Sequence, residues 1–229
     1  MRDIADIVEN EIVAKMNNII NVKQISGNDI TTCGVKWARV GATVTDSLDN
    51  EYQITEVDKT TKVITVNPLG AYVFTGKTLI LNKPYFFTGT PRATNTEWNE
   101  FSIDRRDKSP FIWLVEPTSE TDLTDEDSSI ERDSNLRIAY IDVNDTDNWL
   151  TKDIHEDLLQ PLYNMRTEFL KTIRRNPLFE GVSGSTVQNL TRFGTQNKSG
   201  SEQNIIGENL SGLDSRLTLS IRETDDCNC

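Results

Sequence analysis

The sequence predicts an α+β fold, in which helices pack on a mostly antiparallel sheet and a small all-β module is inserted. Two segments, 3–20 and about 154–175, carry apolar residues at helical spacing. Segments 110–117 and 136–143 have the composition of buried strands, and 35–90 alternates at period two. We therefore expect a core formed by residues 1–34 and 91–229, with an inserted β-barrel or sandwich at 35–90.

The first predicted helix covers residues 3–20. Asp3 stands where an N-cap is expected, and polar residues such as Glu9 and Lys15 fall on the opposite side from the apolar stripe. The stripe predicts a helix that faces the core. Its members are Ile4, Ile7, Val8, Ile12, Met16, Ile19 and Ile20.

The inserted module is predicted from short alternating segments with turn residues between them. ATVTDSLDNEYQITEVDKTTKVITVNP breaks at 49–50 and 59–62, and AYVFTGKTLILN and PYFFTGTP follow. Several five- or six-residue strands in so short a stretch indicate a small barrel or sandwich. A unit of this size has little core of its own, so we expect it to lean on the remainder of the chain.

The sequence after the module predicts two strands separated by an acidic loop. PFIWLVEP is a continuous apolar run bracketed by Pro110 and Pro117, which is typical of a buried strand. LRIAYIDV at 136–143 is the second strand, with Leu136, Ile138, Tyr140 and Asp142 on one face. The polar stretch between them is predicted to be a loop.

The second helix is predicted to begin between Thr151 and Ile154 and to end near Arg175. Acidic residues occupy its first turn and basic residues its last, which suits the helix dipole, and Pro177 follows as a stop. Pro161 should kink the helix or restart it. Beyond it, 187–196 and 216–222 are predicted strands, separated by a long polar loop suited to contact with a partner.

The net charge of −12 is concentrated in one segment. Residues 116–157 hold 14 acidic and three basic residues, a net charge of −11, which leaves about −1 for the other residues. Such a surface repels phosphate, so specific nucleic-acid binding is disfavoured, although DNA could pass without adhering. The sequence has no run long and apolar enough to span a bilayer and begins with acidic residues, so we expect a protein made in the cytoplasm with no membrane partner.

Catalytic motifs are not evident in the sequence. The single histidine, His155, follows a helix start, and Ser183 and Ser185 lie outside a G-x-S-x-G elbow. There is no phosphate-binding glycine motif, and no pair of carboxylates is singled out for hydrolysis. We therefore expect a protein that is not an enzyme, with no catalytic residues and no cofactor.

Metal sites are also not expected. Asp142, Asn144, Thr146 and Asp153 match four positions of a calcium loop, but Asp147 replaces the required glycine. The cysteines give no disulfide framework, and the terminal C-x-C supplies too few ligands for zinc. These cysteines are Cys33, Cys227 and Cys229.

The aromatic residues of the module admit two interpretations, core packing and stacking against a glycan, of which core packing is favoured. They are Trp37, Tyr72, Phe74, Tyr85, Phe86 and Phe87.

The order of elements resembles the tail terminator, or tail completion, proteins of long-tailed bacteriophages. The resemblance covers about 1–34 and 95–222: an N-terminal helix, PFIWLVEP, LRIAYIDV, the helix DLLQPLYNMRTEFLKTIRR, and NLSGLDSRLTLSIR at the end. It rests on element order and segment character, and the 35–90 module departs from the family pattern. It implies a structural virion protein, assembled in the host cytoplasm, whose ring, commonly a hexamer, caps the tail tube and joins it to the neck or connector protein.

The acidic segment gives this resemblance a specific expectation. A ring that lets DNA slide through benefits from a lumen that repels phosphate. The candidate lumen-facing residues are Glu120, Asp122, Asp125, Glu126 and Asp127. The alternatives are another neck, tail or baseplate protein, a module at 35–90 that binds a glycan or peptide, and an acidic-site hydrolase.

Overall fold

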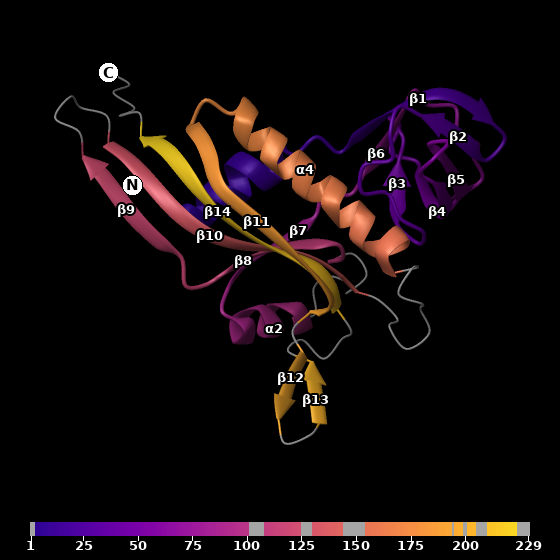
Figure 1. Ribbon diagram of the computed structural model, residues 1–229. Helices are drawn as coiled ribbons and strands as arrows, with labels where there is room; N and C mark the ends of the chain where they lie inside the picture. The colour runs from indigo at the N-terminus through magenta and orange to yellow at the C-terminus, as the bar shows by residue number, and fades with distance from the viewer. Residues whose placement is uncertain are drawn as a thin grey trace.

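The chain is mostly β. The structure, a computed structural model, describes residues 3–100, 108–124, 130–143, 154–193, 195–198, 201–204 and 210–223. Strands account for 48% of the chain and helical segments for 24%, and they form a closed six-stranded barrel beside a second sheet (Figure 1). The predicted class, α+β with helices packed on a mostly antiparallel sheet, is therefore wrong. The prediction missed it because polar segments assigned to loops form long strands.

The barrel closes through antiparallel pairs in the order β1-β2-β5-β4-β3-β6. Its strands are β1 (Ile19–Ser26), β2 (Asp29–Thr32), β3 (Thr43–Thr45), β4 (Glu51–Asp58), β5 (Val63–Pro68) and β6 (Thr78–Leu81). Two of its strands thus precede residue 35, where the inserted module was predicted to begin. Alternate side chains fill the interior, as Tyr52 and Ile54 of β4 and Ile64 and Val66 of β5 show.

The N-terminal segment is helical, but it ends before residue 20. It consists of α1 (Ile4–Ile7), a π-helical turn η1 (Val8–Ile12) and a 3₁₀ turn η2 (Val13–Lys15). The predicted cap is confirmed, because the Asp3 carboxylate accepts a hydrogen bond from the Ala5 amide at 3.0 Å. Helix and barrel meet at Asn17 and Asn18. The Asn17 side chain accepts from the Ile19 amide, and the Asn18 side chain donates to the Leu81 carbonyl.

The second sheet has the order β11-β14-β10-β8-β7, with β9 also paired to β10. Its strands are β7 (Tyr85–Gly89), β8 (Phe111–Val115), β9 (Ser119–Thr124), β10 (Ile130–Val143), β11 (Phe179–Phe193) and β14 (Leu210–Glu223). Pairing is antiparallel except between β7 and β8. β8 and β9 lie end to end along one side of β10, so Ser119–Thr124, predicted to be loop, continues the line that β8 begins.

A separate two-stranded hairpin, β12 (Thr195–Lys198) and β13 (Ser201–Asn204), projects from the sheet where β11 ends and β14 begins (Figure 1). Most of the hairpin falls in the segment predicted to be a long polar loop, whereas Thr195 and Gln196 belong to the predicted strand 187–196.

Two helices lie beside the second sheet (Figure 1). α2 (Pro91–Asn99), not predicted from the sequence, is capped by Thr90, whose hydroxyl accepts from the Ala93 amide. α4 (Gln160–Arg175) follows a π-helical turn η3 (Ile154–Leu159). Pro161 sits in the first turn of α4, where the π-helical turn η3 ends and the regular α-helix begins. Among the described residues, no helix has the length and apolar character needed to cross a bilayer.

Two apolar cores hold these parts together. The larger is continuous from the barrel through the N-terminal helical segment to α4 and one face of the second sheet, so the barrel does lean on the rest of the chain. The smaller packs α2 against the other face, where Phe87, Trp98, Phe111 and Trp113 lie close together. The continuous core fixes the barrel against the sheet.

Tyr140 offers a direct test of the larger core. It is fully buried and packs edge-on against Phe169 at 5.7 Å, and its hydroxyl has no hydrogen-bond partner. A buried hydroxyl without a partner is destabilising. We therefore expect Tyr140→Phe to raise the free energy of unfolding by about 1 kcal/mol in urea denaturation. Tyr52→Phe is the matched control. It should lower stability, because the Tyr52 hydroxyl donates to Asp46 at 3.0 Å.

Candidate interaction surfaces

A buried ion pair joins the barrel to the second sheet. Asp142, at the end of β10, is 1% exposed, and its Oδ2 lies 3.0 Å from the Nε of Arg39 in the β2–β3 connection. The two atoms are not aligned as a hydrogen bond, so the contact is electrostatic. Ser109 donates to Asp142, and the Ser109 carbonyl accepts from Arg39 at 3.1 Å. Burial raises the pKa of Asp142, whereas Arg39, Ser109 and the Val143 amide oppose that rise.

This pair involves Asp142, the described candidate ligand of the segment that partly matches a calcium loop and was not expected to bind metal. Asp142 is occupied by Arg39, and the other loop positions, Asn144, Thr146, Asp147 and Asp153, lie outside the described residues. Within the described part of the chain, no group of three or more His, Cys, Asp or Glu side chains could hold a metal ion. Asp142 therefore serves the junction between barrel and sheet.

The residues considered for nucleophilic catalysis are on the surface. His155, Ser183 and Ser185 are exposed, and the Ser185 hydroxyl accepts a hydrogen bond from Arg166. His155 lies in η3 and the two serines lie on β11, and among the described residues no hydrogen bond joins them. The structure does not bring them together as a catalytic pair.

Two of the five candidate lumen residues lie at the edge of the second sheet. Glu120 and Asp122 are on β9, whereas Asp125, Glu126 and Asp127 lie outside the described residues, as do Cys227 and Cys229. Glu120 is 3.4 Å from the buried guanidinium of Arg132 and accepts from Ser134 at 3.2 Å. Asp122 is exposed, so it contributes its charge to the surface more fully than Glu120 does.

The aromatic residues considered for glycan stacking are in cores. Trp37, Phe74 and Phe87 are buried, and Tyr85 and Phe86 are partly buried. Tyr72 is also partly buried. Its hydroxyl donates to the Glu51 carbonyl at 2.6 Å, and its ring packs edge-on against Tyr52. These rings do not form an open stacking platform.

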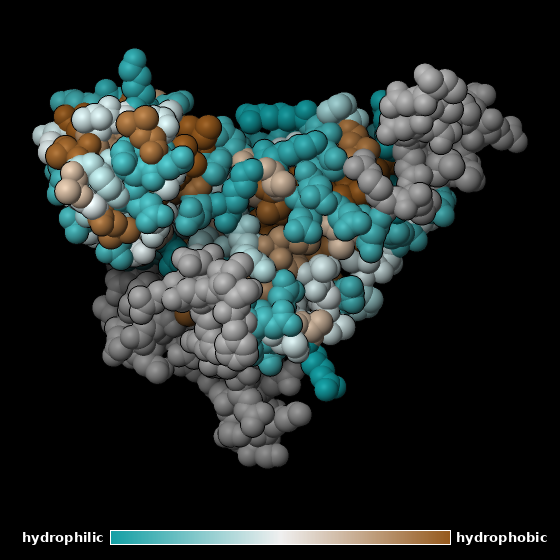
Figure 2. Space-filling view, turned by 180° about the vertical axis from the view of Figure 1, so that it is seen from behind, coloured by the Kyte–Doolittle hydropathy of each residue, from teal (hydrophilic) through white to brown (hydrophobic). Residues whose placement is uncertain are grey.

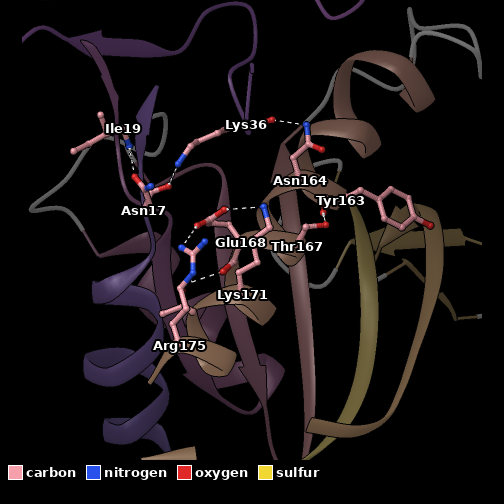
Figure 3. A network of polar contacts seen from close by, with 10 residues as sticks. Asn17, Ile19, Lys36, Tyr163, Asn164, Thr167, Glu168, Lys171 and Arg175 are labelled. Carbon is pink, nitrogen blue, oxygen red and sulfur yellow. Dashed lines mark hydrogen bonds and ion pairs between the residues drawn. The ribbon is translucent and has the colours of Figure 1, made fainter. Parts of the chain in front are cut away.

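Lys36, Lys171 and Arg175 form a basic cluster (Figure 3): Lys171 and Arg175 pair with the carboxylate of Glu168, and Lys36 lies near enough to interact electrostatically with all three. Glu168 is only 7% exposed and lies 3.6 Å from the Lys171 ammonium and 3.7 Å from the Arg175 guanidinium. Burial lowers the pKa of Lys36, as do Lys171 and Arg175, whereas Glu168 raises it. One carboxylate thus faces three cations, which leaves an excess of positive charge.

Backbone contacts fix the cluster at the meeting point of barrel, α4 and N-terminal segment. Lys36 has a positive φ of 45°, and its ammonium donates to the Asn17 carbonyl. Its own carbonyl accepts from the Asn164 side chain at 2.5 Å. Lys36 is therefore held in place rather than free to swing into solvent, whereas the Lys171 and Arg175 side chains are 49% and 68% exposed.

Two further lysines extend the positive surface along the end of the N-terminal segment. Lys83 donates to the Ala14 carbonyl, and Lys15 pairs with Glu11. Glu11 also accepts from the side chain of Asn176, which directly follows Arg175. Five cations and two carboxylates therefore occupy one region of a chain whose net charge is −12.

The second candidate surface is an apolar end of the barrel. Among the described residues, the exposed large apolar side chains all belong to residues 19–73. Four of them are more than half exposed: Leu48 at 73%, Val73 at 69%, Val40 at 58% and Leu69 at 54%. Figure 2 shows several hydrophobic residues on the barrel from behind. Leu48 lies in the turn before β4, and the Leu69 amide donates to Glu51 at the start of β4. Val73 follows Tyr72, whose hydroxyl also bonds to Glu51. Leu48, Leu69 and Val73, the apolar barrel end, therefore lie at one end of the barrel.

Two outer strands of the second sheet, β11 and β9, are poorly suited to pairing with another chain. β11 ends the strand order, but its register shifts between Phe179 and Gly181, Ser183 and Thr186, and Leu190 and Phe193. β9 is only six residues long and carries Glu120 and Asp122. Bulges, short length and charge are features that oppose edge-to-edge pairing. Side-chain surfaces are therefore the better candidates for contact with a partner.

Comparisons with known proteins do not assign the chain to a family. No protein-family model, no curated protein and no solved structure matches the chain. The surfaces described above therefore carry the functional argument.

Sequence reasoning did not find the basic cluster or the apolar barrel end. The basic residues at the end of α4 were interpreted as complements to the helix dipole, which they also are. Lys36 is far from them in sequence, so only the fold could show that three cations meet at Glu168. The apolar barrel end has a signal, the leucines in LDN and PLG turns, where polar residues are usual.

Proposed function

We propose that this chain is a non-enzymatic structural subunit that assembles with copies of itself and with neighbouring proteins. The apolar barrel end carries the proposal. Three large apolar side chains, each more than half exposed, occupy one end of a small barrel. Exposed apolar groups that gather in one place, as opposed to single scattered ones, mark sites of protein contact.

The kind of assembly is proposed from the resemblance stated above. Tail terminator proteins form rings, commonly hexamers, that cap the tail tube and join it to the neck, and such a ring would let DNA pass. The charge distribution supports passage without adhesion, because residues 116–157 hold most of the net negative charge. A role as another neck, tail or baseplate component is the alternative, and it would use the same apolar surface in a different position.

Native mass spectrometry and light scattering of the purified chain test self-assembly. We expect oligomers with a defined subunit number, and we expect Leu48→Ser/Val73→Ser to shift them toward monomers by about tenfold in dissociation constant. Val40→Ser is the matched control, since Val40 is 58% exposed but lies in the β2–β3 connection. A chain that stays monomeric at high concentration, alone and with tail tubes, would contradict the proposal.

The virion role is tested separately by electron microscopy of phage particles made without the protein. Tails of uncontrolled length, or tails detached from heads, are expected if the chain is a terminator. Normal joined particles would contradict that role, whereas particles that lack a tail tube or baseplate would favour the alternative.

A further inference from the structure

We infer that the basic cluster binds the acidic edge of a second copy of this chain, which consists of β9 and the connection that leads to it from β8. The inference rests on the proposed function, because it names one contact by which the assembly forms. The positive charge of the basic cluster indicates that its partner is an acidic surface. The cluster holds Lys36, Lys171 and Arg175 around a single carboxylate, and Lys15 and Lys83 extend it.

The acidic edge has the opposite charge on the same chain. Glu116, which follows β8, and Asp122 of β9 are exposed, and they belong to the segment whose net charge is −11. Glu120, between them, is partly neutralised by Arg132. Acidic side chains therefore line this edge where β8 passes into β9, and a cationic surface of another molecule would match it.

Within one molecule these two surfaces do not meet. The acidic edge lies on one side of β10, whereas β14 and β11 lie on the other side, and α4 packs against β11. The cluster lies where α4, the N-terminal segment and Lys36 meet (Figure 3). Two complementary surfaces at different places on one subunit produce a head-to-tail contact, which repeats to give a ring when the rotation closes.

The local structure of the cluster suits binding to a carboxylate partner. The Lys36 ammonium donates to the Asn17 carbonyl, and the Lys36 carbonyl accepts from the Asn164 side chain, so the charge of Lys36 is preorganised. Lys171 and Arg175 are exposed enough to reach across an interface. Side chains that are already positioned lose less freedom on binding. This contact would place Asp122 between subunits, in competition with the lumen position expected for it from the sequence.

A charge-exchange experiment tests the contact. The cluster variant is Glu168→Gln/Lys171→Glu/Arg175→Glu. Glu168 is replaced by glutamine so that no buried carboxylate lies beside the two new glutamates. The edge variant is Glu116→Lys/Asp122→Lys. We expect each variant alone to self-associate about tenfold or more weakly than the wild type, with folding verified by circular dichroism. Their equimolar mixture should assemble again, because each supplies the charge that the other lacks.

The matched control reverses two exposed lysines of the barrel, Lys23→Glu/Lys77→Glu, and should assemble normally. If the cluster and edge variants assemble as the wild type does, or if their mixture does not regain assembly, the inference is wrong while self-assembly through the barrel end stands. If the wild type is itself monomeric, the proposed function fails as well. If the cluster variant assembles normally but loses binding to a double-stranded DNA oligonucleotide, the cluster is a nucleic-acid contact instead.

Discussion

Arg39→Ala is expected to destabilise the fold by about 3–5 kcal/mol, because it leaves the buried Asp142 carboxylate without its counter-ion. Asp142 is 1% exposed, and the positive charge of Arg39 opposes the rise in the pKa of Asp142 that burial causes. Arg39 also donates to the Ser109 carbonyl, so its loss weakens the junction of barrel and sheet directly. Urea denaturation at pH 7 measures the effect.

The effect of this substitution should depend on pH in a defined direction. Burial already raises the pKa of Asp142 above its unfolded value of 3.8, and removing Arg39 raises it further. A group with a raised folded pKa stabilises the fold below its unfolded pKa, and that contribution is lost as the pH rises through the folded pKa. The stability gap between Arg39→Ala and wild type should therefore widen from pH 4 to pH 7.

Two further variants separate the ion pair from other effects. Arg39→Ala/Asp142→Asn removes both charges and should recover part of the lost stability, with a gap that no longer changes with pH. Arg92→Ala, at an exposed position in α2, should change stability by less than about 0.5 kcal/mol. If Arg39→Ala and wild type differed in free energy of unfolding by the same amount at pH 4 and at pH 7, the loss of stability would not come from Asp142 without its counter-ion.

Elements with a strong apolar pattern were predicted correctly from the sequence. The run at 110–117 is β8, whose five residues are all buried, and 136–143 lies within β10. The helix that ends at Arg175 is also present, with Pro161 at its restart. Period and proline position determine these elements locally, so no knowledge of the fold is needed to find them.

Elements that depend on partners elsewhere in the chain were missed. SETDLT has hardly any apolar content, and it forms β9 because β10 offers unpaired backbone groups along six residues. Ile19 and Ile20 extend the apolar stripe of the N-terminal helix, yet they pair with β6 and begin the barrel. α2 was missed because Trp98 is its one large apolar residue, although Thr90 and Pro91 are a recognisable helix start.

The candidate surfaces were predictable to a smaller degree. The charge of the acidic segment was evident from composition, but the position of Glu120 and Asp122 on an edge strand of the second sheet was not. The basic cluster depends on the contact of Lys36 with Asn17 and Asn164, which are distant in sequence. Surfaces of this kind arise from tertiary packing, so a local sequence pattern does not predict them.

Lys108→Met is expected to destabilise the fold by about 3 kcal/mol. Lys108 is 2% exposed, and its ammonium donates to the carbonyls of Glu97, Trp98 and Glu100 at 2.8–3.3 Å. These carbonyls lie at the end of α2, where backbone acceptors have no partner within the helix. A cation there also complements the negative end of the helix dipole.

Methionine keeps most of the apolar stem of Lys108 and removes the ammonium, so the loss measures the polar contacts rather than a cavity. Because Trp98 packs against Phe87 and Phe111, loosening of α2 should also change the tryptophan fluorescence and speed amide exchange in residues 91–99. Lys23→Met, at an exposed position of β1, is the control and should stay within about 0.5 kcal/mol of wild type. If Lys108→Met were as stable as that control, the three carbonyls would be satisfied by water, and α2 would be held on the sheet by its apolar contacts alone.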